Sequence, residues 1–123
     1  NFLLVFIGGG LGSILRFALA KWLNPLLVQI PFGTLLANVL SCLILGFAAY
    51  YFQTKFSGNT NLKLLILVGF CGGFSTFSTF SNENIALLQS GNYLYASVYV
   101  LGSLFLGFSA ILIGLWIGKW WIN

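Results

Sequence analysis

Gly69-Phe70-Cys71-Gly72-Gly73-Phe74-Ser75-Thr76-Phe77-Ser78-Thr79-Phe80-Ser81-Asn82-Glu83 is the stretch that decides the fold. It lies in a hydrophobic segment, yet it contains a Gly-Gly pair, five hydroxyl residues and the only carboxylate of the chain. Each interior glycine costs a helix about 1 kcal/mol relative to alanine, and Ser and Thr offer the backbone alternative hydrogen bonds. In a bilayer, non-helical backbone survives only where protein buries it or where it lines water. We therefore predict a break at residues 72–76 of a membrane helix, with the function built around it.

The composition of the chain indicates that lipid is the solvent for most of its surface. Of its 123 residues, 59% are hydrophobic and only 5% are charged, whereas soluble domains carry about 25% charged residues. The net charge is +4, from Arg16, Lys21, Lys55, Lys63 and Lys119 against Glu83. A nucleic-acid surface needs clustered cations, so nucleic acid is not an expected partner.

The residue types that usually carry catalysis are scarce. The chain has no His, and its lone acid excludes a carboxylate pair for hydrolysis or a cage for a hard metal ion. Cys42 and Cys71 fall in apolar segments, which favours small buried side chains over a disulfide framework. We therefore do not expect an enzyme.

The hydrophobic segments are long enough to cross a membrane. A spanning helix needs about 20 mostly apolar residues, and four segments fit, at residues 2–22, 32–52, 62–88 and 93–121. These segments nearly exhaust the chain and leave only short loops. We predict an all-α membrane protein in which residues 1–123 form one domain of four transmembrane helices, the third of them broken near its middle.

The cations are almost evenly divided between the two sides of such a bundle. Lys55, Lys63 and Lys119 would lie on one side, and Arg16 and Lys21 on the other. The positive-inside rule cannot choose an orientation from so small a bias. We hypothesise that the chain inserts both ways and pairs as an antiparallel, dual-topology homodimer, surrounded by lipid.

Small residues and one cation characterise the first span. Gly8 with Gly12 and Gly9 with Ser13 are small-xxx-small pairs, which let helices approach closely. Arg16 follows Gly12 by four residues and shares its helix face. It either extends to the lipid headgroups or lies in a water-filled vestibule and draws anions inward.

A polar line runs along the second span, at Thr34, Asn38 and Ser41. Asn38 lies close to the middle of the span, where an amide is costly. One interpretation is an interhelical hydrogen bond, worth about 0.6 kcal/mol on average. The other, which we favour, is an amide N–H donor that faces a permeating anion.

Two phenyl rings follow the expected break. Phe77 and Phe80 are three residues apart and therefore neighbours on one helix face. Such rings usually contact lipid or fill a core, but the edge of a ring is also the positive part of its quadrupole. Ring edges, hydroxyls and an amide can line an anion path without a formal charge. The helix that resumes after the break presents its positive end, and carbonyl groups before the break offer ligands for a small cation.

The fourth span carries a stripe of small residues at Gly107, Ala110, Gly114 and Gly118, headed by two hydroxyl residues. The stripe predicts a packing seam. Tyr99 and Ser103 are placed to face the same polar path as Asn38.

These segments together resemble the Fluc-type (CrcB-like) fluoride channels of microbes. The resemblance covers nearly the whole chain and is carried by residues 9–16 (GGLGSILR), 32–38 (FGTLLAN) and 69–81 (GFCGGFSTFSTFS). It implies a dual-topology homodimer with two antiparallel pores in the cell inner (plasma) membrane. It also implies passive, fluoride-selective efflux that reduces the toxicity of fluoride in the cytoplasm.

The resemblance also implies roles for individual residues. Phe77 and Phe80 would flank the fluoride ion, with Asn38 as a polar neighbour. The remaining implied positions are Ser78 and Thr79 in a polar track, Tyr99 and Ser103 on the pore side of the fourth helix, and Arg16 and Glu83 in the vestibules. Backbone oxygens of Gly72 and Ser75 would hold a structural sodium ion at the dimer centre. Gly107 stands where some members of the family have Ser, and Ser75 replaces a common Thr.

Two other functional classes fit some of these features. A small dual-topology, proton-coupled multidrug antiporter shares the size, the number of spans and the balanced charges. That mechanism needs a carboxylate within the membrane, best in the first span, whereas the first span here has Arg16 and no acid. A packing subunit of a larger complex is the third possibility.

Overall fold

The computed structural model describes residues 1–27, 29–55 and 58–122, and every regular element in these ranges is helical. The elements are α1 (Phe2–Leu23), the short 3-10 helix η1 (Asn24–Leu26), α2 (Phe32–Thr54), α3 (Thr60–Lys63), the π-helix η2 (Leu64–Phe70), α4 (Cys71–Phe74), α5 (Phe77–Gln89) and α6 (Tyr93–Ile122). The predicted all-α class is therefore confirmed for the described part of the chain.

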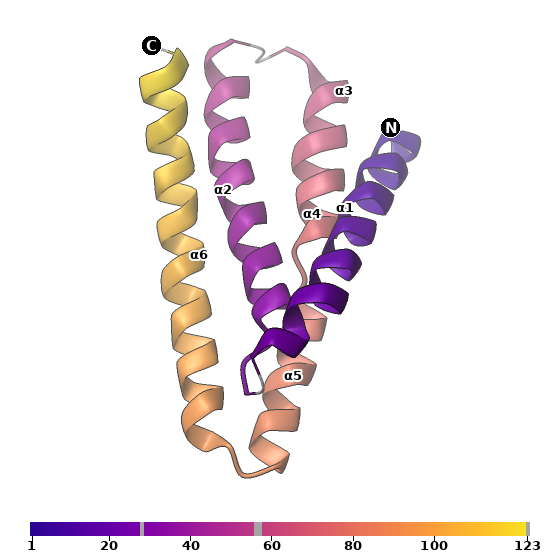
Figure 1. Cartoon of the computed structure of the whole chain (residues 1–123). Coiled ribbons are helices and arrows are strands. Elements are labelled where there is room, and N and C mark those ends of the chain that lie inside the picture. Colours follow the sequence, from indigo (N-terminus) through magenta and orange to yellow (C-terminus); the bar gives the residue numbers. More distant parts are fainter. Residues whose placement is uncertain (28, 56–57, 123) are drawn as a thin grey trace.

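Four candidate membrane spans are found in the described ranges, as the hydrophobic segments predicted. They are Phe2–Leu26, Phe32–Thr54, Thr60–Gln89 and Tyr93–Ile122. The start of α1, the end of α2, the start of α3 and the end of α6 lie at one end of the bundle, and the turn between α5 and α6 lies at the other (Figure 1). Consecutive spans therefore run in opposite directions.

Local capping explains where several helices begin and end. The Asn1 side chain accepts a hydrogen bond from the N–H of Leu3 (2.9 Å), and that of Asn59 accepts one from the N–H of Leu62 (3.0 Å). Side-chain oxygens of this kind satisfy N–H groups that lack a partner in the first helical turn. Gly91 has a φ of 82° in the turn between α5 and α6, a conformation that favours glycine.

The helices pack by backbone contact at the small residues. On the first span, a Cβ at Gly8 would overlap the Leu65 carbonyl of η2, and a Cβ at Gly12 would overlap the Phe70 carbonyl. Because Gly has no Cβ, α1 can lie directly on η2 and α4. The predicted role of Gly8 and Gly12 in close helix approach is confirmed.

The contact between α2 and α6 is reciprocal. A Cβ at Gly46 would overlap the Ile111 carbonyl, and a Cβ at Gly114 would overlap the Leu43 carbonyl. Gly118 also lies against α2, with its nearest contact at the Tyr50 Cβ (3.1 Å). The stripe on the fourth span is therefore a packing seam, as predicted.

A wide helical segment precedes the central stretch. Residues of η2 follow π-helical rather than α-helical hydrogen bonding, a geometry that is rare and often found near functional sites. A Cβ added to Gly69, near the end of η2, would lie 3.1 Å from the Gly8 Cα. The π-helix thus leads directly into α4 and is in backbone contact with α1.

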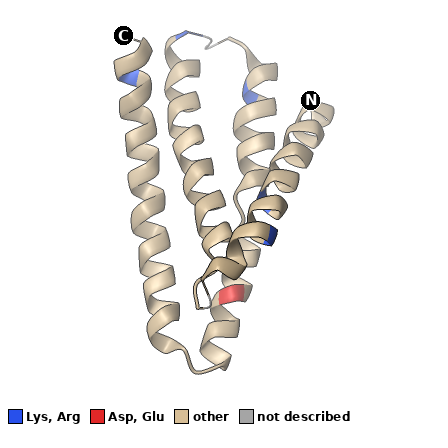
Figure 2. Ribbon diagram, in the orientation of Figure 1, with Lys and Arg blue, Asp and Glu red and all other residues tan. Residues whose placement is uncertain are grey.

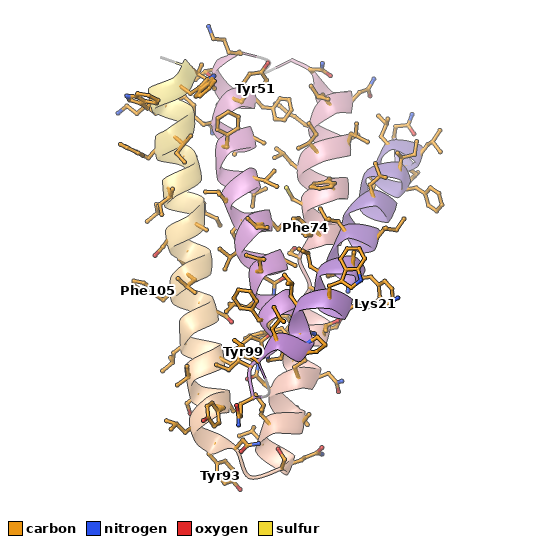
Figure 3. The ribbon with its side chains drawn as sticks, viewed as in Figure 1. Lys21, Tyr51, Phe74, Tyr93, Tyr99 and Phe105 are labelled. Atoms are coloured by element: carbon orange, nitrogen blue, oxygen red, sulfur yellow. The ribbon has the colours of Figure 1, made fainter. Side chains whose placement is uncertain are left out.

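The outer surface of the bundle is apolar. Phe105 is 72% exposed and points away from the helices, whereas Phe74 lies in the interior (Figure 3). The charged positions are few; the acidic residue is in α5, and basic residues lie near the helix ends and in the second half of α1 (Figure 2). Four apolar helices with this surface are those of a multi-pass membrane protein.

The glycine seam makes a prediction. Gly114→Ala should lower the free energy of unfolding by about 1–3 kcal/mol, because overpacking against a backbone carbonyl forces the helices apart. The measurement is denaturant unfolding of the purified protein in detergent. Gly102→Ala, on the same helix, is the matched control: no atom lies within 4 Å of an added Cβ there, so its stability should be equal or slightly higher. Equal free energies of unfolding for Gly114→Ala and Gly102→Ala would contradict close packing of α2 and α6 at this glycine.

Candidate functional site

The backbone leaves the helical conformation between α4 and α5. Ser75 has φ −86° and ψ 157°, and Thr76 has φ −153° and ψ 125°. The Ser75 hydroxyl donates to the Cys71 carbonyl at 2.9 Å, and the Thr76 hydroxyl accepts from the N–H of Thr79 at 3.3 Å. One hydroxyl residue therefore closes α4, and the next caps the start of α5.

The non-helical residues are fewer than predicted. We expected the break to begin at Gly72, but Gly72 and Gly73 both lie within α4. A Cβ at Gly73 would overlap the Gly9 carbonyl, whereas Gly72 is exposed with no atom within 4 Å of an added Cβ. Gly73 is therefore required for the close approach of α1, not for the non-helical backbone at Ser75 and Thr76.

Asn38 on α2 binds the backbone of Thr76. Its Oδ1 accepts from the Thr76 N–H at 2.8 Å, and its Nδ2 donates to the Thr76 carbonyl at 3.4 Å. Three residues further along α2, the hydroxyl of Ser41 donates to the Cys71 carbonyl at 2.9 Å. The interhelical role considered for Asn38 is present, and the second N–H of its amide has no partner among the described residues.

A groove of about 280 Å³ lies beside this backbone. It brings together five residues predicted for the site, Asn38, Ser75, Phe77, Phe80 and Ser103. Its other lining residues are Cys42, Thr76, Leu104, Gly107, Phe108 and Ile111. None of these lining residues is charged, and the only nitrogen- or oxygen-bearing side chains among them are the amide and hydroxyl groups. The groove can therefore stabilise an anion only through weak donors and ring edges.

Two phenyl rings form one wall of the groove. The ring centroids of Phe77 and Phe80 are 6.2 Å apart with an interplanar angle of 42°, so the predicted neighbourhood of the two rings is confirmed. Phe77 is 80% exposed in the single chain. Ser103 also lines the groove, and its Oγ is buried and has no hydrogen-bond partner among the described residues. A buried hydroxyl without a partner is costly.

Glu83 lies at the centre of a second polar cluster. Its two oxygens accept hydrogen bonds from the Thr34 hydroxyl on α2 and the Tyr99 hydroxyl on α6, both at 2.8 Å. The ring of Tyr99 lies 5.0 Å from that of Phe80, and its side chain is 1% exposed in the interior near α2 and α5 (Figure 3). Tyr99 therefore packs against the ring of Phe80 in the interior and does not line the groove of this chain.

A second cavity, of about 370 Å³, adjoins the carboxylate. Its lining residues include Asn24, Gln29, Pro31, Glu83, Ser90 and Asn92. The vestibule role expected for Glu83 stays a prediction. Thr34 belongs to the predicted polar line of the second span, but its partner, the carboxylate, was not identified from the sequence.

Ser78, Thr79 and Arg16 also lie outside the groove. Ser78 is exposed, with its hydroxyl 3.4 Å from that of Thr76, and Thr79 donates its N–H to the same Thr76 oxygen. Arg16 is half-buried, and its Nε–H donates to the Gly73 carbonyl at 3.0 Å. Arg16 and Glu83, both predicted for vestibules, thus have different partners and do not share a site.

Comparisons with known proteins identify the family. A family profile described as "CrcB-like protein, Camphor Resistance (CrcB)" matches residues 3–115. A Serratia proteamaculans protein named "Fluoride-specific ion channel FluC" is 45% identical over 121 residues, covering 95% of each chain. The protein of the same name from Phocaeicola vulgatus is 38% identical over 120 residues, covering 97% of this chain and 98% of its own. On this match of profile and full-length relatives, the chain belongs to the CrcB-like family.

Proposed function

We propose that this chain is a fluoride-selective channel for passive efflux across the cell membrane. The observation that carries the proposal is the groove, in which two phenyl rings, an amide and a buried hydroxyl meet without a charged side chain. Fluoride is small and tightly hydrated, so it leaves water only for donors at close range. N–H, O–H and ring-edge C–H groups supply such donors, and the relatives' name agrees with this chemistry.

The proposed path passes a break in the third membrane helix. The positive end of α5 begins at Phe77, next to the groove, and attracts anions as other half-helix ends do. Asn38 holds the break in place through Thr76 and keeps one N–H for the ion. Ser78 and Thr79, outside the groove of this chain, would form a polar track toward it.

We propose further that two chains associate in antiparallel orientation and form two pores. The groove is open along one side, where Phe77, Leu104 and Phe108 are exposed, so a second copy is needed to enclose the ion. The near-even distribution of cations between the two sides of the bundle supports insertion in both orientations.

A structural sodium ion at the dimer centre belongs to the same proposal. Backbone carbonyls are the oxygen ligands that hard cations prefer. The Gly72 carbonyl has no donor among the described residues, and the space around Gly72 is open. Neighbouring carbonyls already accept hydrogen bonds, Gly73 from Arg16 and Thr76 from Asn38. Gly72 and Ser75 of each chain therefore fit the site as two pairs of ligands, which a second copy would complete.

The multidrug-antiporter alternative has no support from the relatives, which are named as fluoride channels. Its required carboxylate would have to be Glu83, and both oxygens of Glu83 are already bound by Thr34 and Tyr99. Fluoride-electrode efflux from liposomes that contain only this chain, with chloride as the control ion, tests the proposed function directly.

Replacing either ring tests the proposed fluoride contact. Phe77→Ile or Phe80→Ile should abolish fluoride efflux, because an aliphatic side chain has no positive ring edge, while the protein remains folded. Phe105→Ile is the matched control, since Phe105 is 72% exposed and points away from the bundle (Figure 3). Efflux at the parental rate from both ring variants would remove the rings from the mechanism.

Asn38 has a separate, graded prediction. Asn38→Ala leaves the Thr76 N–H without its partner at a cost of about 1–3 kcal/mol, which corresponds to roughly a tenfold to hundredfold slower efflux if it falls on the barrier. Asn82→Ala, on the exposed face of α5, is the control and should retain the parental rate. An unchanged rate for Asn38→Ala would limit Asn38 to packing.

Dual topology is tested by accessibility labelling. Cysteines placed singly at Asn59 and Asn92 lie at opposite ends of the bundle. In sealed vesicles, a membrane-impermeant thiol reagent should label about half of each site from outside and half from inside, because the charge bias is too small to select one orientation. The parent chain, with its native Cys42 and Cys71, gives the background. Labelling of each site from one face alone would contradict the antiparallel dimer.

A further inference from the structure

We propose that Arg16 is a positioning residue of the pore, which neutralises the carbonyl end of α4 so that only the positive end of α5 acts on the anion path. The inference rests on the proposed fluoride-channel function and assigns Arg16 a task different from anion capture in a vestibule. It follows from the contact that Arg16 makes and from the way in which two helix ends meet at Ser75 and Thr76.

The close approach of α1 and α4 brings the guanidinium to its partner. One turn before Arg16, an added Cβ at Gly12 would lie 2.7 Å from the Phe74 nitrogen and 3.1 Å from the Gly73 carbonyl carbon. With the backbones in contact, the Nε–H of Arg16 reaches the Gly73 carbonyl at 3.0 Å, across 57 positions of sequence. A hydrogen bond from a charged donor is stronger than one between neutral groups.

Two helix ends of opposite polarity meet within two residues. The helical run of α3, η2 and α4 ends at Phe74, and carbonyls at such an end carry about half a negative charge. Helix α5 begins at Phe77, and its free N–H groups carry about half a positive charge. For an anion in the groove beside Ser75 and Thr76, these two partial charges would largely cancel.

The two helix ends have different partners: the carbonyl end of α4 accepts from the charged Arg16, whereas the Thr79 N–H at the start of α5 donates to the neutral Thr76 hydroxyl. The Cys71 carbonyl accepts from Ser41 and Ser75, which are neutral groups. The Gly73 carbonyl accepts from a full positive charge. With the negative end of α4 neutralised, the positive end of α5 is the partial charge that remains, and it favours an anion near Phe77. Arg16 itself is not among the residues that line the groove.

Positioning and capture predict different kinetics. A cation that collects fluoride from water acts on its local concentration, so raising the fluoride concentration compensates for its loss. A fixed cation at the break acts on the energy of the ion inside the pore. Removing it therefore lowers the efflux rate even at saturating fluoride. Lys21, an exposed cation five positions later on α1, provides a control for charge alone.

The experiment compares Arg16→Gln, Arg16→Lys and Lys21→Gln in liposomes, with fluoride efflux measured against internal fluoride up to saturation. We expect Arg16→Gln to lower the maximal rate at least tenfold with little change in the half-saturating concentration. Arg16→Lys keeps the charge, without the planar guanidinium, and should retain most of the rate. Lys21→Gln should match the parent. Size-exclusion chromatography and thermal unfolding of every variant report on folding.

Each alternative outcome is distinct. A parental maximal rate for Arg16→Gln overturns the inference, as does a loss that higher fluoride restores, because that result assigns Arg16 to capture. Equal inactivity of Arg16→Lys and Arg16→Gln, together with lower unfolding temperatures, overturns it in favour of packing alone. Absence of efflux from the parent chain contradicts the proposed function itself, whereas parental efflux with an unaffected Arg16→Gln variant contradicts only the inference.

Discussion

The structure depends on satisfying the polar backbone where the third span leaves the helical conformation, at Ser75 and Thr76. Lipid offers no hydrogen bonds, and each unsatisfied group costs several kcal/mol there, so protein must supply the partners. Asn38 binds both backbone groups of Thr76, and neighbouring carbonyls accept from Ser41 and Arg16. The polar residues of the first two spans, which are unusual in membrane helices, have their explanation in this requirement.

That requirement explains the packing as well. Glycines at the contacts of α1 with η2 and α4 let these backbones approach closely, and this approach brings Arg16 of α1 to the Gly73 carbonyl. Glu83 also connects helices: its carboxylate, on α5, accepts hydrogen bonds from one hydroxyl on α2 and one on α6. Polar groups therefore connect helices whose outer surfaces are mostly apolar.

Much of this architecture was predictable from local patterns. Four apolar segments gave the spans, and small-residue spacing gave the seams of α1 and α6, because both are properties of a helix considered alone. The adjacency of Phe77 and Phe80 also follows from helical periodicity. The prediction that the glycines of the central stretch form the break was wrong, because Gly73 lies in α4 and is needed for contact with the backbone of Gly9 on another helix.

Side-chain partners between helices were the part that the sequence could not provide. The bond of Thr34 to Glu83 and that of Arg16 to Gly73 depend on the rotation and tilt of separate helices. Those quantities are set by the packing of whole surfaces, and no spacing rule within one segment contains them. One local signal was available: a hydroxyl residue directly before an apolar helical run, such as Thr76, is typical of a helix cap.

The π-helical segment η2 has a consequence for how sequences of this type can change. Most π-helical turns arise as single-turn bulges within α-helices, and a π turn holds more residues than an α turn of similar height. A chain that lost one residue between Leu64 and Phe70 could revert to tighter winding and still bring its glycines to α1. Length variation among relatives should therefore be tolerated in this segment, before the residues that line the groove, because a change in helical winding can compensate for it.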